Sequence, residues 1–183
     1  IAAGNVVLTA ENGGIGEAGD YLDLDVGPSG TMTATAESDI YLAETFGDMR
    51  IRNVVSYTGD VDLKAQQSIL DAVDLTDALD PDSAEVFTPS SLPRVDVTGN
   101  NITLTAELGY IGAPANDVDI NSAYSAAGTL TSSSYANTYI IEPHGNLWLN
   151  TVETTDGTAF ITVPAGDILN ANPGGENVLS GKT

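Results

Sequence analysis

Gly4-Asn5-Val6-Val7-Leu8-Thr9-Ala10-Glu11 is the stretch that decides the fold, because it returns as Gly99-Asn100-Asn101-Ile102-Thr103-Leu104-Thr105-Ala106-Glu107. An isoleucine–glycine pair follows each copy, Ile15-Gly16 in the first and Ile111-Gly112 in the second. Further matches continue along the chain at an offset that drifts from 95 to 99 residues. A long internal repeat of this kind is typical of modular, solenoid-like architectures.

A shorter period lies inside the long repeat. Glycines open alternating apolar runs at spacings of 26, 29, 40, 29 and 29 residues, at Gly4, Gly30, Gly59, Gly99, Gly128 and Gly157. After each glycine every second residue is apolar or small, which indicates a strand with one buried face. One isoleucine follows each run, and we expect all six to point inward: Ile15, Ile40, Ile69, Ile111, Ile140 and Ile168. Two or three short strands per unit predict a right-handed parallel β-helix of about six coils.

The domain organisation follows from these two periods. We interpret residues 1–183 as a single β-solenoid segment that contains two long repeats, 4–98 and 99–183. A rival fold is two tandem immunoglobulin-like sandwiches, because a repeat of about 95 residues is also the size of such a domain. A sandwich, however, has no reason to show a nested period of about 29 residues.

The 40-residue spacing predicts an insertion at residues 73–93, in the third coil. Insertions in solenoids leave from turns and often form the binding face. Phe87 and Leu92 are therefore candidate contacts for a partner, since a fully solvated acidic loop has little use for large apolar side chains. The alternative is that the insertion is only such a solvated acidic excursion.

The composition excludes several classes of partner. Five basic residues stand against 26 acidic ones, a net charge of −21, and this charge repels nucleic acid and anionic lipid headgroups. No run of about 18 apolar residues is present, so we expect no membrane-spanning segment. The chain contains no cysteine, which rules out disulfides and thiolate metal sites.

The recurring pattern Gly-Asn/Asp-apolar-x-Leu-Thr-Ala-Glu-x-x-x-Ile-Gly, best seen at 4–16 and 99–112, resembles the repeats of filamentous haemagglutinin-type proteins. These are large repetitive surface and secreted proteins of bacteria. The resemblance implies a right-handed parallel β-helix, export to the cell surface or the extracellular space, and a structural or adhesive role in fibres, stalks or coats. It carries over no binding residue.

Signals for catalysis are few. His144 is the only histidine, in a Glu-Pro-His-Gly stretch that reads as a turn, and no cysteine accompanies it. Nucleophilic triads of the usual kind are therefore absent, and we expect no enzymatic activity. A carbohydrate-active β-helix enzyme or a glycan-binding module is the alternative hypothesis. It requires a cleft lined by aromatic side chains and paired acids beside the insertion.

Calcium is the one cofactor that the sequence leaves open. Three pairs of aspartates place carboxylates two residues apart on strands: Asp23 with Asp25, Asp60 with Asp62, and Asp117 with Asp119. Hard oxygen ligands from neighbouring coils could converge there, which would make the chain a calcium-dependent adhesion module. The plainer interpretation of these acids is a solvated surface.

A register for the coils follows from aligning the third strand of each coil by its buried residues. This alignment sets Asp23 beside Arg50 and Asp25 beside Arg52, with Asp96 approaching Arg50 from the third coil. By the same alignment Asn121 stacks on Asn150. Such pairs would fix the register of an acidic stack.

The apolar start of the chain and the apolar Val178-Leu179 near its other end have no polar cap. Terminal coils of solenoids normally need polar caps. We therefore expect continuation of the parent chain or end-to-end self-association, with a glycan or a host or cell-surface ligand as a further partner.

Overall fold

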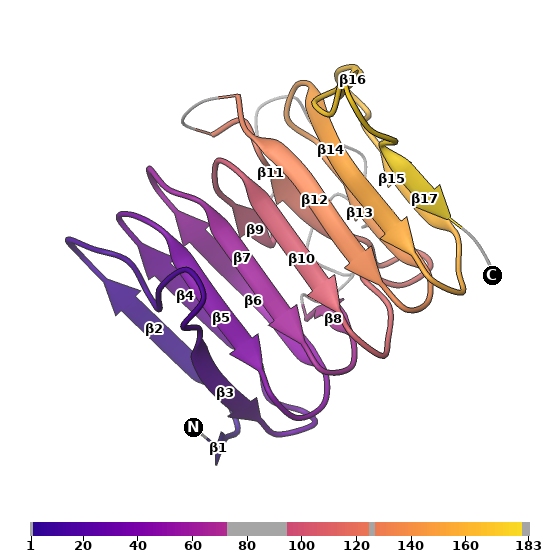
Figure 1. Cartoon of the computed structure of the whole chain (residues 1–183). Helices are drawn as coiled ribbons and strands as arrows, with labels where there is room; N and C mark the ends of the chain where they lie inside the picture. Colours follow the sequence, from indigo (N-terminus) through magenta and orange to yellow (C-terminus); the bar gives the residue numbers. More distant parts are fainter. Residues whose placement is uncertain (1, 73–94, 125–126, 181–183) are drawn as a thin grey trace.

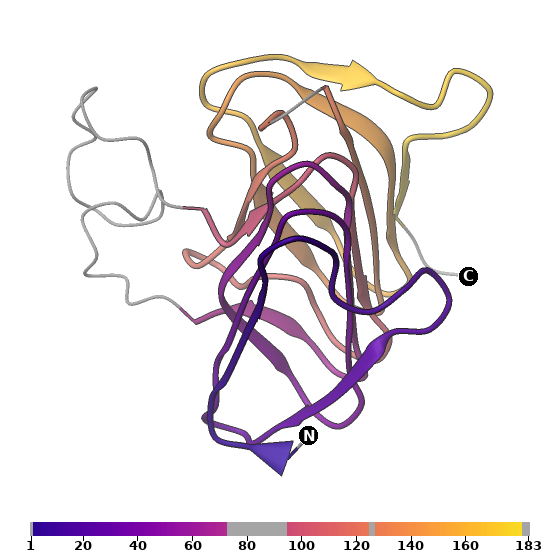
Figure 2. The same ribbon diagram turned by 90° about the vertical axis from the view of Figure 1, so that its left-hand side faces the viewer.

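The computed structural model describes residues 2–72, 95–124 and 127–180, and this part of the chain forms strands and turns without a helix. Two sheets run along the molecule, and the chain crosses from one to the other at each half-coil (Figure 1). The coils stack around a shared interior, with the N-terminal coils (indigo) and the C-terminal coils (yellow) at opposite ends of the stack (Figure 1, Figure 2). All described strand pairs are parallel, which confirms a parallel β-solenoid. The tandem immunoglobulin-like alternative is wrong, because its sheets are antiparallel.

The first sheet contains nine strands: β1 (Ala2–Ala3), β3 (Leu22–Val26), β5 (Ile40–Glu44), β7 (Val61–Ala65), β10 (Ile102–Ala106), β12 (Thr129–Ser134), β14 (Leu147–Thr154), β16 (Ile168–Asn170) and β17 (Val178–Ser180). The second sheet contains eight: β2 (Val6–Ala10), β4 (Met32–Ala36), β6 (Met49–Ser56), β8 (Ile69–Asp71), β9 (Val97–Thr98), β11 (Val118–Asn121), β13 (Thr138–Ile141) and β15 (Ala159–Thr162). Each inner strand hydrogen-bonds to strands of the coils before and after it, and the outermost strands pair on one side only.

The core consists of the side chains that the alternating pattern points inward. Those predicted from the glycine-opened runs are mostly buried: Val6, Met32, Val61, Leu63, Ile102 and Leu104. Leu8 and Ile161, in the outermost strands of the second sheet, are only partly buried. Of the six isoleucines, five are buried and Ile168 is exposed. They are divided between the two sheets, since Ile40 belongs to the first sheet and Ile69 to the second.

The long repeat spans seven half-coils. Strand β2 lies in the second sheet, whereas its counterpart β10, 96 residues later, lies in the first. Between them the chain alternates through β3 to β7 and then the level shared by β8 and β9. Because seven is an odd number, corresponding strands of the two repeats always lie on opposite sheets. One repeat therefore advances the solenoid by three and a half coils.

Two irregularities recur at matching positions and confirm this correspondence. A bulge interrupts the pairing of β4 with β6 after Met32, and another interrupts β12 with β14 after Leu130. The strand that follows is also split in both repeats, as β8 and β9 beside β6, and as β16 and β17 beside β14. The expected insertion 73–93 falls in the first of these splits and, with Phe87 and Leu92, lies outside the described residues.

The glycine spacing is not the length of one coil. Gly4 and Gly30 precede β2 and β4, neighbours in one sheet, but Gly59 precedes β7 in the other sheet. The interval from Gly30 to Gly59 thus covers one and a half coils. Hydrogen-bonded partners outside the first insertion are 19–28 residues apart, as in Met32 with Ile51 and Ile102 with Leu130. Consequently the described residues reach eight levels in the first sheet and seven in the second, more than the six coils expected.

The predicted aspartate–arginine ladder is wrong for the same reason. Strand β3 pairs with β5, which sets Asp23 opposite Ala43 and leaves Asp25 opposite Ala2 of β1. Arg50 lies in β6, in the other sheet, opposite Leu70. Arg52 is the extra residue of the bulge in β6.

The other members of the predicted ladder also have different neighbours. Asp96 adjoins Val54, whose N–H donates to its carbonyl, rather than Arg50. Asn121 pairs with Thr98. Asn150, the bulge residue of β14, donates from Nδ2 to Thr131 Oγ1 at 3.0 Å. Thus Asn121 does not stack on Asn150, because their strands belong to different sheets.

A side-chain ladder not predicted from sequence connects successive coils. An asparagine or aspartate stands immediately before each of seven strands, and its side-chain oxygen accepts the backbone N–H of the matching residue one coil later. The pairs, at 2.8–3.2 Å, are Asn5 with Thr31, Asp39 with Asp60, Asp48 with Ser68, Asp60 with Asn101, Asn101 with Thr129, Asn137 with Thr158, and Asn146 with Asp167. This ladder explains the Asn/Asp of the repeat pattern. It satisfies backbone N–H donors at the corners and fixes the position of each coil relative to the preceding one.

The glycine of each isoleucine–glycine pair is required by its backbone. Gly16 and Gly112 have φ of +69° and +66°, in the left-handed region. A Cβ at either position would also lie 2.3 Å from a carbonyl oxygen of the next coil, that of Tyr41 or Tyr139. Any larger residue is therefore excluded by both conformation and space.

Truncation of the core is expected to be costly. Leu63→Ala or Leu104→Ala removes a fully buried side chain from the middle of the stack, and we expect a loss of about 2–5 kcal/mol in the free energy of unfolding. Thr105→Ala, on the outer side of the same strand as Leu104, is the matched control and should cost far less. Chemical denaturation measures all three. Equal losses for Leu104 and Thr105 would contradict the assigned inward phase.

The side-chain ladder can be tested at Asp60, whose Oδ1 accepts Asn101 N at 3.0 Å. Asp60→Ala leaves that N–H without its partner, and we expect it to lower the free energy of unfolding by about 1 kcal/mol. Asp60→Asn keeps an oxygen acceptor and should recover most of the loss. If the alanine and asparagine variants were equally stable in denaturation, the bond would have no role in fixing the coils.

Candidate functional site

Three aspartates lie together on the second sheet. Asp71 ends β8, Asp96 directly precedes β9, and Asp119 lies in β11 of the next coil. The N–H of Asp119 donates to Asp96 Oδ2 at 3.0 Å, and the N–H of Asp96 donates to the Asp119 carbonyl at 2.9 Å. The Asp71 and Asp96 carboxyl groups are hydrogen-bonded to each other. The fold brings Asp71 and Asp96 together because β8 and β9, on either side of residues 73–94, share one strand position beside β6.

Burial controls the chemistry of this cluster. The three side chains expose only 1–4% of their surface. This burial raises the pKa of Asp96 well above its usual value, and the nearby charges of Asp71 and Asp119 raise it further, against the lowering effect of the Asp119 N–H. The Asp96 carboxyl group therefore keeps its proton to a higher pH than an exposed aspartate does.

The geometry does not suit glycoside hydrolysis. The two carboxyl groups of a glycosidase flank the scissile bond at a separation of roughly 5–9.5 Å. Asp71 and Asp96 are instead in direct hydrogen-bond contact, and their exposure is too small for a sugar to reach them. The cluster therefore lies beside the insertion, as the enzyme hypothesis requires, but without the required spacing or access.

Two buried glutamates occupy equivalent corners of the two repeats. Glu44 accepts the N–H groups of Val26 and Phe46 at 2.9 and 3.2 Å. Glu142, 98 residues later, accepts the N–H and Oγ–H of Ser122, both at 2.8 Å, and the N–H of His144 at 3.1 Å. Burial raises the pKa of both carboxyl groups, whereas these donated bonds lower it. Their duplication indicates a structural role, joining the ends of strands in successive coils.

The outer side of the first sheet carries a polar cluster near a shallow hollow. Tyr21 donates from its hydroxyl to Asp62 Oδ2 at 2.5 Å, and its ring lies edge-on to Tyr41 at 5.9 Å. Lys64 Nζ lies 4.1 Å from the centre of the Tyr21 ring, within cation–π range. Burial raises the pKa of Tyr21, and the bond to Asp62 adds to this.

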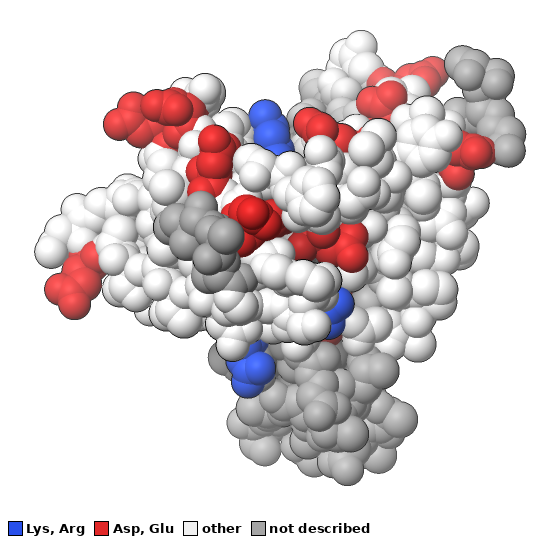
Figure 3. Space-filling view, turned by 90° about the horizontal axis from the view of Figure 1, so that it is seen from below, with Lys and Arg blue, Asp and Glu red and all other residues white. Residues whose placement is uncertain are grey.

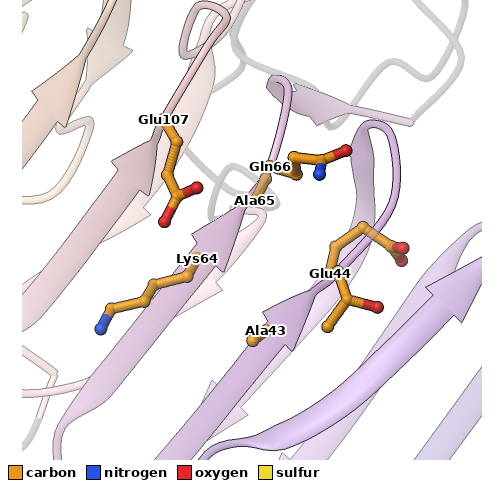
Figure 4. A pocket seen from close by; sticks show the side chains of 7 residues that line it. Ala43, Glu44, Lys64, Ala65, Gln66 and Glu107 are labelled. Carbon is orange, nitrogen blue, oxygen red and sulfur yellow. The ribbon is translucent and has the colours of Figure 1, made fainter.

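The hollow itself has a volume of about 250 Å³ (Figure 4) and is lined by Ala43, Glu44, Thr45, Lys64, Ala65, Gln66 and Glu107. It lies at the corner where β5, β7 and β10 end. One lysine and two glutamates give it mixed charge. Neither this hollow nor the tyrosine cluster was predicted, since both depend on which strands become neighbours.

The predicted calcium ligands do not converge. Asp23 and Asp25 lie on β3, whereas Asp60 belongs to the corner ladder and Asp62 binds Tyr21. Asp119 lies in the buried cluster, and burial raises the pKa of the nearby Asp117. In the described ranges no three acidic or histidine side chains are grouped to hold a metal ion.

The surface reflects the acidic composition. Acidic side chains are spread over the face seen in Figure 3, with few basic ones among them. His144 lies half-buried in the turn before β14, and its N–H is bound by Glu142. No helix of the described residues is long and apolar enough to cross a membrane.

Comparison of the chain with protein-family models, with curated proteins and with solved structures found no match.

The raised pKa of Asp96 predicts that stability depends on pH. Because the pKa of Asp96 is higher in the folded chain than the value of about 3.9 in the unfolded one, its contribution favours folding below pH 4. That contribution is lost as the pH rises through the folded-state pKa. We expect Asp96→Asn, which needs no proton, to be more stable than the wild type at pH 7–8, and this advantage to shrink toward pH 4.

Urea denaturation at several pH values measures this difference, which amounts to about 1.4 kcal/mol for each unit of pKa shift. Asp23→Asn makes the same change of charge at an exposed position and serves as the control. A pH profile for Asp96→Asn that matches the Asp23→Asn profile would show that Asp96 is ionised in the folded chain.

Proposed function

We propose that this chain is a structural and adhesive segment of an extracellular bacterial fibre, stalk or surface coat, and that it is not an enzyme. Its architecture supports this proposal: two repeats of three and a half coils build one continuous stack in the described residues. The interactions that recur from coil to coil, in the apolar interior and the corner ladder, hold the coils in register. The buried acids Glu44 and Glu142 occupy equivalent positions in the two repeats. The buried acids Asp71 and Asp96 lie too close together for glycoside hydrolysis.

The observation that carries the proposal is the open interior at the end of the stack. Ile168 and Val178 occupy inward positions above the buried Leu147 and Val152, yet they expose 52% and 50% of their surface. In every inner coil such positions are covered by the next coil. An exposed apolar surface with free strand edges is a surface for continued stacking.

Adhesion is supported by aromatic side chains on the outside of the coils. Five of the exposed ones are Phe46, Tyr57, Tyr110, Tyr124 and Tyr135. Tyr57 and Tyr124 lie near each other, with ring centres 6.5 Å apart. Tyrosine combines a large apolar face with a polar tip and is enriched where proteins contact ligands. We propose a glycan or a host or cell-surface molecule as the ligand, contacted through these rings.

A tandem fusion tests whether the chain is a stacking segment. Joining Ser180 of one copy directly to Gly4 of the next keeps the register seen where β9 leads into β10. We expect one rigid rod of about 67 Å, twice the roughly 34 Å of seven coils at about 4.8 Å each. Small-angle scattering gives this length, and the unfolding midpoint should exceed that of the single copy.

The control fusion carries Leu8→Asp in the second copy, which places a charge inside the junction. It should behave as two separate bodies. If the unmodified fusion also scattered as two flexibly joined bodies, with the midpoint of a single copy, the fibre proposal would fail. Release of reducing ends from neutral or acidic polysaccharides would likewise overturn the assignment as a non-enzyme.

A further inference from the structure

The C-terminal end of the stack offers two strand edges and an uncovered interior. In the second sheet β15 is the last strand, and its inward residues Ala159 and Ile161, with Val163 just beyond, are only partly buried. In the first sheet β16 and β17 both end the stack, with Ile168 and Val178 exposed. What covers this end can be deduced from the junction between the two repeats.

That junction is the pairing of β10, the first full strand of the second repeat, with β7. Ile102 lies opposite Val61, Leu104 opposite Leu63, and Ala106 opposite Ala65. All six side chains are buried. The backbone continues the seam at the corner, where the N–H of Asn100 donates to Gly59 and that of Val61 to Asn101.

The chain presents the same two surfaces again at its opposite ends. Strand β15 is the counterpart of β7, 98 residues later, and β2 is the counterpart of β10, 96 residues earlier. Their inward residues form matching sets: Val6, Leu8 and Ala10 on β2, and Ala159, Ile161 and Val163 on and after β15. Both strands are at the edge of the second sheet.

Because two repeats complete seven whole coils, β2 and β15 lie on the same side of the solenoid. A single repeat would have placed its two ends on opposite sides. The two edges can therefore meet in the continuation of one helix, without any rotation of one molecule by a half-turn.

We propose that a second copy of this chain stacks head to tail on the first, with β2 of one copy pairing in parallel register with β15 of the other. Val6 then lies opposite Ala159, Leu8 opposite Ile161, and Ala10 opposite Val163. This inference rests on the proposed structural role and names the partner of the open end. The contact is heterologous, so it repeats along a filament without closing.

The first sheet supplies the rest of the contact. At the internal junction Ile69 bridges to Ile111, and Val97 pairs with Ile120. The matching residues place Ile168 under Ile15, and Val178 under Leu24, of the second copy. In the second copy, β1 pairs with the edge of β3 through only two residues, Ala2 and Ala3. Strand β17 of the first copy takes its place. Ile168 and Val178, half-exposed in one chain, thereby become buried.

Charge sets the conditions for assembly. Each copy has a net charge of −21, so two copies repel each other at low ionic strength. Assembly should therefore increase with salt, as repulsion is screened and apolar burial is retained. We expect sedimentation velocity of the full chain in 0.5 M NaCl to show a series of species that grows with protein concentration.

Two blocking variants separate a head-to-tail contact from any other. Leu8→Asp charges the N-terminal surface, and Ile168→Asp charges the C-terminal one. Each alone is expected to sediment as a monomer, whereas an equimolar mixture should form dimers and stop there. Val7→Asp, on the outer side of β2, is the matched control and should assemble like the wild type. Circular dichroism and thermal midpoints confirm that each variant is folded.

Register is tested by disulfide capture, which the absence of native cysteines makes specific. The β7–β10 pairing of Lys64 with Thr105 corresponds to Thr162 of one copy opposite Thr9 of the next. A mixture of Thr9→Cys and Thr162→Cys chains, oxidised in 0.5 M NaCl, should yield a mixed disulfide dimer at least ten times faster than Thr9→Cys with Asp156→Cys.

A wild-type chain that stays monomeric up to millimolar concentration at high salt would overturn the second-copy proposal. So would assembly by either blocking variant alone, or equal capture at positions 156 and 162. If the tandem fusion forms a rigid rod while separate copies stay monomeric, the structural role stands and only the intermolecular contact fails. If the fusion also fails, both proposals are wrong.

Discussion

Hydrogen bonding between coils is the constraint on which the whole structure depends. In a parallel solenoid the backbone N–H and C=O groups of a strand find their partners in the coils before and after it, and rarely within their own coil. No coil is therefore satisfied alone, and each one fixes the position of the next. The inward apolar residues and the asparagine–aspartate ladder both fix the register between neighbouring coils, because both resist sliding of one coil along another.

Much of the strand content could be predicted from the sequence, because period two is a local signal. Val61, Leu63 and Ala65 are read as inward-facing from their alternation with polar residues, and they are inward-facing. The coil length could not be read in the same way. Equal glycine intervals of 29 residues correspond to one coil between Gly99 and Gly128 but to one and a half between Gly30 and Gly59. The chain crosses between two sheets, and nothing local marks which sheet a strand will join.

The candidate site shows the same division between local and non-local information. Glu44 falls in the inward phase of Ile40 and Leu42, so its burial was implied by the alternation, and its recurrence as Glu142 marked it as part of the repeat. The meeting of Asp71, Asp96 and Asp119 had no such signal, because it requires the strand to resume after an insertion. The cluster of Tyr21, Asp62 and Lys64 depends likewise on strand order, because Tyr21, just before β3, meets two residues of β7, which lies two coils further along the first sheet. A predicted register that is wrong by half a coil therefore misses both clusters.

The half-coil in the repeat has a consequence for the outline of any long array. A strand of the second sheet is divided into β8 and β9, and a strand of the first sheet into β16 and β17, one repeat later. Such breaks are where solenoids lengthen their loops. In a row of these repeats, successive breaks would lie in opposite sheets, about 17 Å apart along the axis, since three and a half coils advance by that amount. The breaks therefore alternate between the two sides of the stack. Insertions carried at these breaks would therefore face a given side of the solenoid only at every second repeat.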